Sequence, residues 1–189
     1  MDERPVPSPE ALALGRKPAE ALPADSEWGS DLPLGLLAPD ERWQNSMVGT
    51  RSDLEDVVRR FEEHEATPEK VSRLLLTSRN LFVHSYFVHE FSIVGALWSL
   101  HAVEAALKDL LGVPDNDYQT TFTEMVGKAQ ARGWLTVQEG ERMRGGAKLR
   151  NGLVHSREQG TLTAGVAVML LEASHEFVAT LYERAGVSR

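Results

Sequence analysis

The chain has 189 residues, of which 42% are hydrophobic, and a formal net charge of -8 at pH 7. This length and composition are those of a globular protein with one core, alone or with an appendage. Because the chain contains no cysteine, the composition excludes disulfides, thiolate metal sites and a cysteine nucleophile, and it fits a reducing compartment.

The hydropathy and the N-terminal composition argue against a membrane protein. No uninterrupted apolar run approaches the roughly 18 residues that a membrane-spanning helix needs. The opening "MDERPVPSPE" is acidic and rich in proline, unlike a signal peptide or an amphipathic transit peptide. We therefore expect a soluble, cytoplasmic protein without a membrane partner.

The negative charge is unevenly distributed along the chain. Residues 1–66 hold 15 Asp and Glu against 7 Lys and Arg, whereas residues 67–189 hold 13 of each. The segment 128–157 contains seven basic residues and, as acids, only Glu139 and Glu141. The basic residues are Lys128, Arg132, Arg142, Arg144, Lys148, Arg150 and Arg157. For contact with RNA phosphates, such a local basic patch matters more than the net charge of the whole chain. The alternative is that these basic residues lie on helix faces that only contact water.

Residues 1–50 form an acidic N-terminal segment in which proline is concentrated. Seven of the nine prolines lie in residues 1–40. Because proline fixes φ and lacks an N–H group, this segment can form neither a long helix nor a central strand. We expect an extended or disordered arm. The side chains that could dock it on a core are Trp28, Leu34, Leu36 and Leu37.

A short amphipathic helix is expected over residues 51–66. Ser52 followed by Glu55 has the spacing of a capping box at a helix start. The apolar stripe consists of Leu54, Val57, Val58 and Phe61. The next helix should begin at Thr67, as the cap, with Pro68 in its first turn.

Residues 67–189 have helical periodicity almost throughout. The first part, up to about Leu111, is predicted to be one long helix or two helices that meet near Ser92–Gly95. A second capping box, Thr121 with Glu124, starts a helix that Gly133 should end.

A third capping box, Thr136 with Glu139, starts the helix that should run into residues 149–156. Gly145 and Gly146 should each weaken this helix by roughly 1 kcal/mol relative to alanine. The last helix is expected over about 161–184. Its apolar stripe consists of Leu162, Val166, Met169, Leu170, Ala173, Phe177 and Leu181. The predicted fold class is all-α, a bundle of four or five helices behind the N-terminal arm.

Two octamers share the spelling Arg-Asn-x-x-x-His: "SRNLFVHS" at 78–85 and "LRNGLVHS" at 149–156. In the second octamer, Asn151 and His155 are four residues apart and share a helix face, with Arg150 alongside. Arg150 also continues an apolar stripe, which points it toward a groove or partner rather than toward bulk water. That stripe consists of Met143, Ala147 and Val154.

The second octamer has the side chains that RNA cleavage without a metal needs. The imidazole of His155 can take and return protons near pH 7, and the guanidinium of Arg150 can bind a phosphate through two hydrogen bonds. Asn151 can orient a hydroxyl or phosphate oxygen. The spacing also arises by chance, as the first octamer shows.

The first octamer lies among aromatic residues with few basic neighbours. We therefore interpret Arg79, Asn80 and His84 as structural, with Arg79 at the surface beside an aromatic core. Three isolated histidines are interpreted as surface or core-edge residues, and two tryptophans as core anchors. These are His64, His101 and His175, with Trp98 and Trp134.

The octamer at 149–156, at the end of one helix and just before the last, resembles the signature of the HEPN superfamily. "LWSLHAVEAALKDLLG" at 97–112 resembles the long early helix of that family, and "TFTEMVGKAQARGWLT" followed by "EGERMRGGAKLRNGLVHS" resembles its later half. The similarity covers roughly residues 70–184. It implies that residues 67–189 form a HEPN-like bundle.

The resemblance also implies a function. Many members of the family are metal-independent endoribonucleases, often toxins or antiviral effectors, that act as dimers. The implied catalytic residues are Arg150, Asn151 and His155, and Lys148 and Arg157 would support them. Glu104 would orient Arg150 or His155; the alternative for Glu104 is an exposed pair with Lys108. No metal or organic cofactor is implied, and the implied partners are RNA, a second copy of the chain and a cognate antitoxin or defence-system protein.

The sequence leaves two other hypotheses about function open. Other members of the family keep the fold but serve as binding or regulatory modules, in which Arg150 and His155 would fasten a partner. Alternatively, the acidic segment 1–66 is the functional part, and it shields the basic patch within the same chain.

Overall fold

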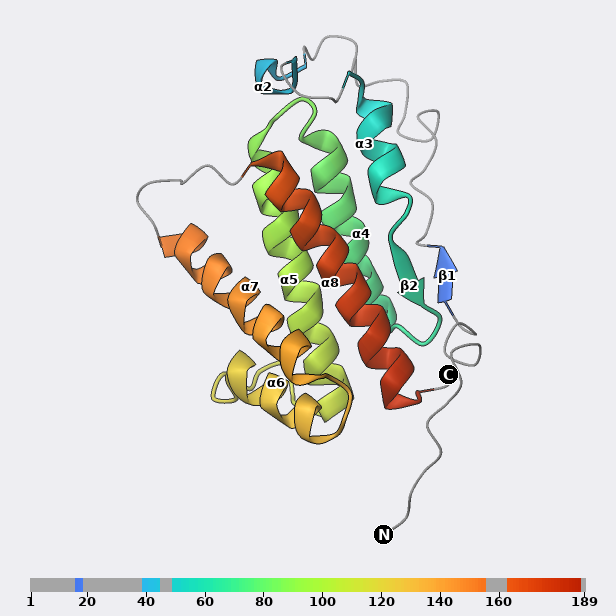
Figure 1. The fold of residues 1–189 in the computed structure, drawn as a ribbon, viewed down its shortest axis with the longest axis vertical. Coiled ribbons are helices and arrows are strands. Elements are labelled where there is room, and N and C mark those ends of the chain that lie inside the picture. Colours follow the sequence, from blue (N-terminus) through green and yellow to red (C-terminus); the bar gives the residue numbers. More distant parts are fainter. Residues whose placement is uncertain (1–15, 19–38, 45–48, 156–162, 188–189) are drawn as a thin grey trace.

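A computed structural model of the chain describes residues 16–18, 39–44, 49–155 and 163–187 (Figure 1). Its helices are α2 (Glu41–Gln44), α3 (Arg51–Val58), α4 (Glu69–His84), α5 (Glu90–Leu111), α6 (Phe122–Ala131), α7 (Val137–His155) and α8 (Ala164–Ala185). The strands are β1 (Arg16–Pro18) and β2 (Glu62–His64). The predominance of helix confirms the all-α class.

Helix α5 is the centre of the bundle, since it packs against α4 on one side and α8 on another. Figure 1 shows these three helices side by side, with α6 across the lower end and α7 leaning away from α8. Helices α4 and α5 approach closely at Gly95, where a Cβ atom would lie 2.8 Å from the carbonyl oxygen of Ser78. Glycine is therefore required at this crossing.

The core has two parts along the length of α5. The lower part gathers side chains from α4, α5, α6, α7 and α8, including Leu75, Leu107, Met125 and Tyr182. The upper part gathers side chains from α2 to α5 and α8, including Trp43, Leu54, Phe82 and Leu171. Both parts consist mainly of apolar side chains, so burial of apolar surface is the main stabilising term of the fold.

Two short strands are an element that the sequence did not predict. The helix expected over 51–66 ends at Val58, and residues 62–64 instead form β2, which pairs antiparallel with β1 and packs against α8. In the register, Arg16 lies opposite His64 and Pro18 opposite Glu62. Strands of three residues are too short to show apolar alternation, which is why the pattern gave no signal.

Helix caps agree with the sequence at some helices and differ at others. The capping boxes of Thr121 with Glu124 and of Thr136 with Glu139 are confirmed, with backbone N–H to side-chain distances of 2.7–3.2 Å. The cap of α3 is Thr50 with Asp53, not Ser52 with Glu55.

Other helix boundaries also differ in detail. The N-cap of α4 is Pro68 rather than Thr67. Residues up to 111 form two helices, but these meet at 85–89 rather than at 92–95. Helix α6 ends before Gly133, whose φ of 74° is the left-handed conformation that favours glycine.

The face that α8 buries agrees with the predicted stripe only in part. Leu181 is fully buried, and Leu170 and Phe177 pack against the core, whereas Val166 and Met169 are 38% and 67% exposed. Leu162 lies outside the described residues. The buried face also includes Ala167, Leu171 and Val178, because α8 is apolar on two faces and periodicity alone does not say which face meets the core.

Helix α8 is also long and apolar enough to cross a membrane by length and composition alone. Glu172 and Glu176 interrupt the apolar sequence of α8, so this helix does not contradict the prediction about uninterrupted apolar runs. Of its most apolar window, 44% is buried inside the bundle, and α8 packs directly against α5. Helix α8 is therefore one of the core helices of the bundle.

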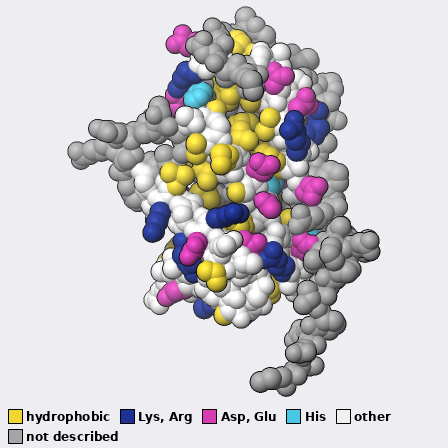
Figure 2. Space-filling view, viewed as in Figure 1, with side chains coloured by type: hydrophobic (Ala, Val, Ile, Leu, Met, Phe, Trp, Pro, Cys, Tyr) yellow, Lys and Arg dark blue, Asp and Glu magenta, His cyan; other side chains and the backbone are white. Residues whose placement is uncertain are grey.

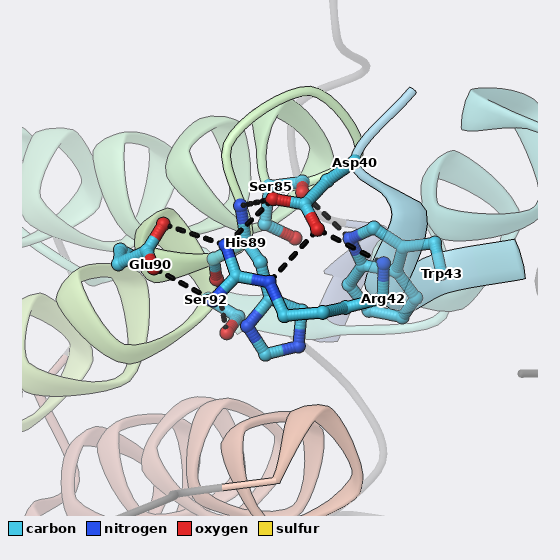
Figure 3. Close-up of polar contacts among 7 residues, drawn as sticks. All are labelled: Asp40, Arg42, Trp43, Ser85, His89, Glu90 and Ser92. Atoms are coloured by element: carbon cyan, nitrogen blue, oxygen red, sulfur yellow. Dashed lines mark hydrogen bonds and ion pairs between the residues drawn. The ribbon is translucent and has the colours of Figure 1, made fainter. Parts of the chain in front are cut away.

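The end of the N-terminal arm is attached to the turn between α4 and α5 (Figure 3). The indole Nε1 of Trp43 donates a hydrogen bond of 2.6 Å to the carbonyl oxygen of Ser85, and Trp43 is buried. Arg42 pairs with both Asp40 and Glu90 at 2.6 and 2.7 Å. The hydrogen bonds from Arg42 hold the pKa of Asp40 well below its usual range.

Residues 39–44 are therefore part of the folded unit, although the expected arm extended to residue 50. The side chains that were expected to dock the arm, those of Trp28, Leu34, Leu36 and Leu37, lie outside the described residues. Trp43 is a docking residue that the sequence analysis missed.

Candidate functional site at the end of α7

The centre of the candidate site is an ion pair between Arg150 of α7 and Glu104 of α5. Nη1 of Arg150 donates to Oε2 of Glu104 at 2.8 Å, and the two side chains are 22% and 27% exposed. Arg150 therefore turns toward α5 and not straight into water, while its predicted orientation toward a groove or a partner stays a prediction. Glu104 was expected either to orient Arg150 or His155 or to form an exposed pair with Lys108. In the structure it pairs with Arg150.

Helix α7 brings these residues together because it continues without interruption from Val137 to His155. Gly145 and Gly146 keep helical backbone and have no positive φ, so the double glycine does not break the helix. The buried side chain of Met143 anchors α7 in the lower core. Arg150 lies two helical turns further along the same face.

Asn151 is exposed next to Arg150, whose Nε donates to its Oδ1 at 3.5 Å. His155 is the last residue of α7, and its side chain lies outside the described atoms. Because the backbone is helical from Asn151 to His155, the two residues share one face of α7.

The supporting basic residues differ in their surroundings. Lys148 is exposed, and Arg157 lies outside the described residues. Arg144 donates to the side-chain oxygen of Gln130 at 2.7 Å, and the guanidinium of Arg132 lies 4.8 Å from the centre of the Trp134 ring. Arg144 and Arg132 thus contact neutral groups and keep their positive charge.

The geometry leaves one side of Arg150 available to an anion. Nη1 is bonded to Glu104 and Nε lies near Asn151, but Nη2 has no partner among the described residues. A carboxylate that holds a guanidinium in one plane lowers the entropy lost when the guanidinium binds a phosphate. It also neutralises part of the charge that attracts the phosphate.

The first octamer is placed quite differently. Arg79 is 2% exposed and pairs with the equally buried Glu63 of β2 at 3.1 Å. The predicted surface position of Arg79 was therefore wrong, although its predicted structural role is supported. No local pattern could reveal this pair, because its two residues come from different elements. His84 is half-buried, and burial, with the positive charge of Arg51, lowers its pKa.

The three isolated histidines were predicted at the surface or at the edge of the core. His101 is exposed, but His64 lies on a strand and is buried, and its Nδ1 accepts the N–H of Ala66 at 3.2 Å. His175 is 1% exposed, packs against the ring of Phe61, and has a pKa lowered to about 3, mainly by burial. His175 is thus a neutral core residue.

Trp98 was predicted as a core anchor but is 38% exposed, with its ring plane at 63° to that of His101. Trp134 packs against the lower core, as predicted. No group of three or more His, Asp and Glu side chains that could hold a metal ion occurs within the described ranges.

Comparisons with protein-family models, with curated proteins and with solved structures found no significant match to this chain.

Proposed function

We propose that the chain is a cytoplasmic, metal-independent endoribonuclease of the HEPN type that acts as a homodimer. The reactive residues would be Arg150, Asn151 and His155. The observation that supports this proposal best is the ion pair of Arg150 with Glu104. It holds a partly exposed guanidinium near the end of α7, and the Nη2 group has no partner among the described residues.

In the proposed reaction, the ribose 2′-OH attacks the adjacent phosphorus. A bond forms between O2′ and phosphorus while the bond from phosphorus to O5′ breaks. His155 accepts the proton of the 2′-OH, and the His155 of a second copy donates a proton to the leaving O5′. Arg150 stabilises the crowded phosphorus through Nη2, and Asn151 positions a phosphate oxygen. The products are a 2′,3′-cyclic phosphate and a 5′-hydroxyl end.

The test is cleavage of single-stranded RNAs in the presence of EDTA. Wild type is expected to cut RNA but not the same sequence with 2′-deoxyribose, and His155→Ala and Arg150→Lys are expected to lose at least a hundredfold in rate. His84→Ala is the matched control, since His84 has the equivalent position in the first octamer. Equal rates for wild type and His155→Ala, or no cleavage by wild type, would refute the catalytic proposal.

A second candidate function is a non-catalytic binding module of the same family. It is favoured by the fact that Glu104 neutralises Arg150 in the single chain. In this case Arg150 and His155 fasten a second copy or a partner protein. Arg150→Ala would then change the oligomeric state or the partner affinity, measured by light scattering, while RNA stays intact with every variant.

A role as a toxin or antiviral effector, with a cognate antitoxin or defence-system partner, follows from the family resemblance alone. Regulation by the acidic segment 1–66 is a separate proposal. Deletion of residues 1–38 keeps the attached residues 39–44, and an increase in RNA binding by this variant would support shielding of the basic patch.

A further inference from the structure

A groove lies between α7 and α8, and α5 forms its floor. Its volume is about 390 Å³. The floor includes Leu100, the α7 wall includes Met143 and Leu149, and the α8 wall includes Leu170 and Phe177. Figure 2 shows hydrophobic side chains gathered in the middle of this face of the molecule. The groove is separate from the Arg150–Glu104 pair, and neither of those residues lines it.

The double glycine of α7 shapes this groove. A Cβ on Gly146 would lie 3.3 Å from Cδ2 of Leu100, so α7 approaches α5 closely at that point. A Cβ on Gly145 would have no atom within 4 Å, so this position opens into free space. Neither glycine has a positive φ that would require it. Both glycines lower the stability of the helix. The absence of a side chain at Gly145 leaves room on the α7 wall of the groove.

The upper end of the groove exposes apolar side chains. Leu149, Val166 and Met169 are 37%, 38% and 67% exposed. Covering these side chains with an apolar molecule would be favourable, because their surface would leave water. The groove thus has the properties of a ligand site in a helical bundle, which is concave and mostly apolar with a few polar groups at one end.

The polar groups lie at the end of the groove near the start of α7. Glu139 is neutralised there by Arg184 at 2.8 Å. Arg142 is exposed, and no carboxylate lies within 4 Å of it in the described part of the chain. Glu176 is exposed and borders the groove on α8. Among the described residues that line the groove, Arg142 is the basic one, so it is the group that can bind an anionic head group.

We propose that this groove binds a small amphiphile, a medium-chain carboxylate, with its chain along α5 between Gly145 and Met169 and its head on Arg142. A volume of 390 Å³ lies at the lower end of the range for small-molecule sites. A second copy of the chain fits this groove less well. In a two-fold dimer centred here, the groove of one copy would face the groove of the other, and neither would be filled. The site is independent of the proposed ribonuclease function.

The experiment uses calorimetric titration of the full chain with decanoate, decylamine and decanol, each below its micellar concentration. Gly145→Leu is expected to fill the groove without strain, and Gly127→Leu is its matched control, because a Cβ on Gly127 of α6 also meets nothing within 4 Å. Arg142→Gln removes the charge for the head group.

Wild type and Gly127→Leu are expected to bind decanoate equally and more tightly than the amine or the alcohol. Gly145→Leu is expected to bind decanoate at least tenfold more weakly, and Arg142→Gln to bind decanoate and decanol alike. The proposal is overturned if wild type binds none of the three, if Gly145→Leu binds as wild type does, or if decylamine binds best. It is also overturned if wild type is a dimer that Gly145→Leu converts to monomer, since a second copy then covers the groove.

Discussion

The two octamers of this chain have the same six-residue spelling from arginine to histidine, but they lie in opposite surroundings. In each, the arginine pairs with a glutamate from another element, Arg79 with Glu63 and Arg150 with Glu104. The side chains of the first pair are 2% and 4% exposed, whereas those of the second are 22% and 27% exposed. The same contact is therefore a core feature in one octamer and a half-exposed surface feature in the other.

This difference matters because the environment decides what an ion pair does. A buried pair leaves an uncompensated charge in the core when one partner is removed, whereas a partly exposed pair is screened by water and adds little stability. An arginine that must bind a substrate has to be of the second kind. The comparison thus assigns structure to the first octamer and leaves the second available for function.

The largest expected effect comes from breaking the buried pair. Arg79→Met should lower the free energy of unfolding by about 3–5 kcal/mol, because the carboxylate of Glu63 stays buried without its cation. The double variant Arg79→Met with Glu63→Leu should recover most of this loss. Urea denaturation at pH 7 measures both values. A loss below about 1 kcal/mol for Arg79→Met would contradict the core role of the first octamer.

Alanine at two glycines gives the next contrast. In Gly95→Ala the new methyl group would meet backbone atoms of Ser78 and Phe82 at 2.8 and 3.2 Å, so α4 and α5 must shift, at a cost of about 2–3 kcal/mol. Gly152, in the second octamer, has open space around its Cβ position. Gly152→Ala should therefore raise stability by up to about 1 kcal/mol through helix propensity. The melting temperatures of the two variants should shift in opposite directions. A shift in the same direction would contradict the difference between the crowded position of Gly95 and the open position of Gly152.

The core around Arg79 should also make stability depend on pH. The pKa of His175 is about 3 in the folded chain against an ordinary value of 6.5, so between these values the unfolded state binds a proton that the folded state does not. The free energy of unfolding should then fall by about 2 kcal/mol from pH 7 to pH 5. His175→Leu should remove most of this slope in urea titrations, with a small remainder from His84, whose pKa is also lowered. A wild-type stability that is flat over this pH range would disprove the neutral, buried state of His175.

The smallest expected effect is at the second octamer. Arg150→Met and Glu104→Gln should each change the free energy of unfolding by less than about 1 kcal/mol, since both side chains are partly exposed. The coupling energy from the double variant should be of the same size. If Arg150→Met unfolds the chain, the pair is structural, and a loss of RNA cleavage in that variant would carry no mechanistic information.

The sequence predicted well those features that depend on neighbouring residues. The helical class follows from apolar periodicity, and the capping boxes at Thr121 and Thr136 follow from local hydrogen bonds between residues three apart. Met143 and Arg150 lie two turns apart on one face of α7, and Met143 is buried in the core as its place on the stripe indicated. The continuous helix from 137 to 155 keeps Asn151 and His155 on one face, as their spacing indicated.

The sequence failed where a residue's partner lies far away in the chain. The spacing of the first octamer gave no sign that Arg79 meets Glu63, and the two apolar faces of α8 left open which one is buried. Two tryptophans show the same limit: Trp43, which the sequence analysis missed, is buried at the α4–α5 turn, whereas Trp98, the predicted core anchor, is 38% exposed. None of these outcomes has a local signal, because burial depends on what packs against a side chain.

Local propensity was enough to make this chain a set of amphipathic helices and to place a guanidinium, an amide and an imidazole within two turns of α7. Only the packing of α4, α5, α7 and α8 decided that Arg79 is buried, that Arg150 meets Glu104 at a half-exposed edge, and that a groove stays open beside α7. The physical reason is that hydrogen bonds within a helix join residues close in sequence, whereas desolvation and charge pairing depend on elements that meet only in the folded chain.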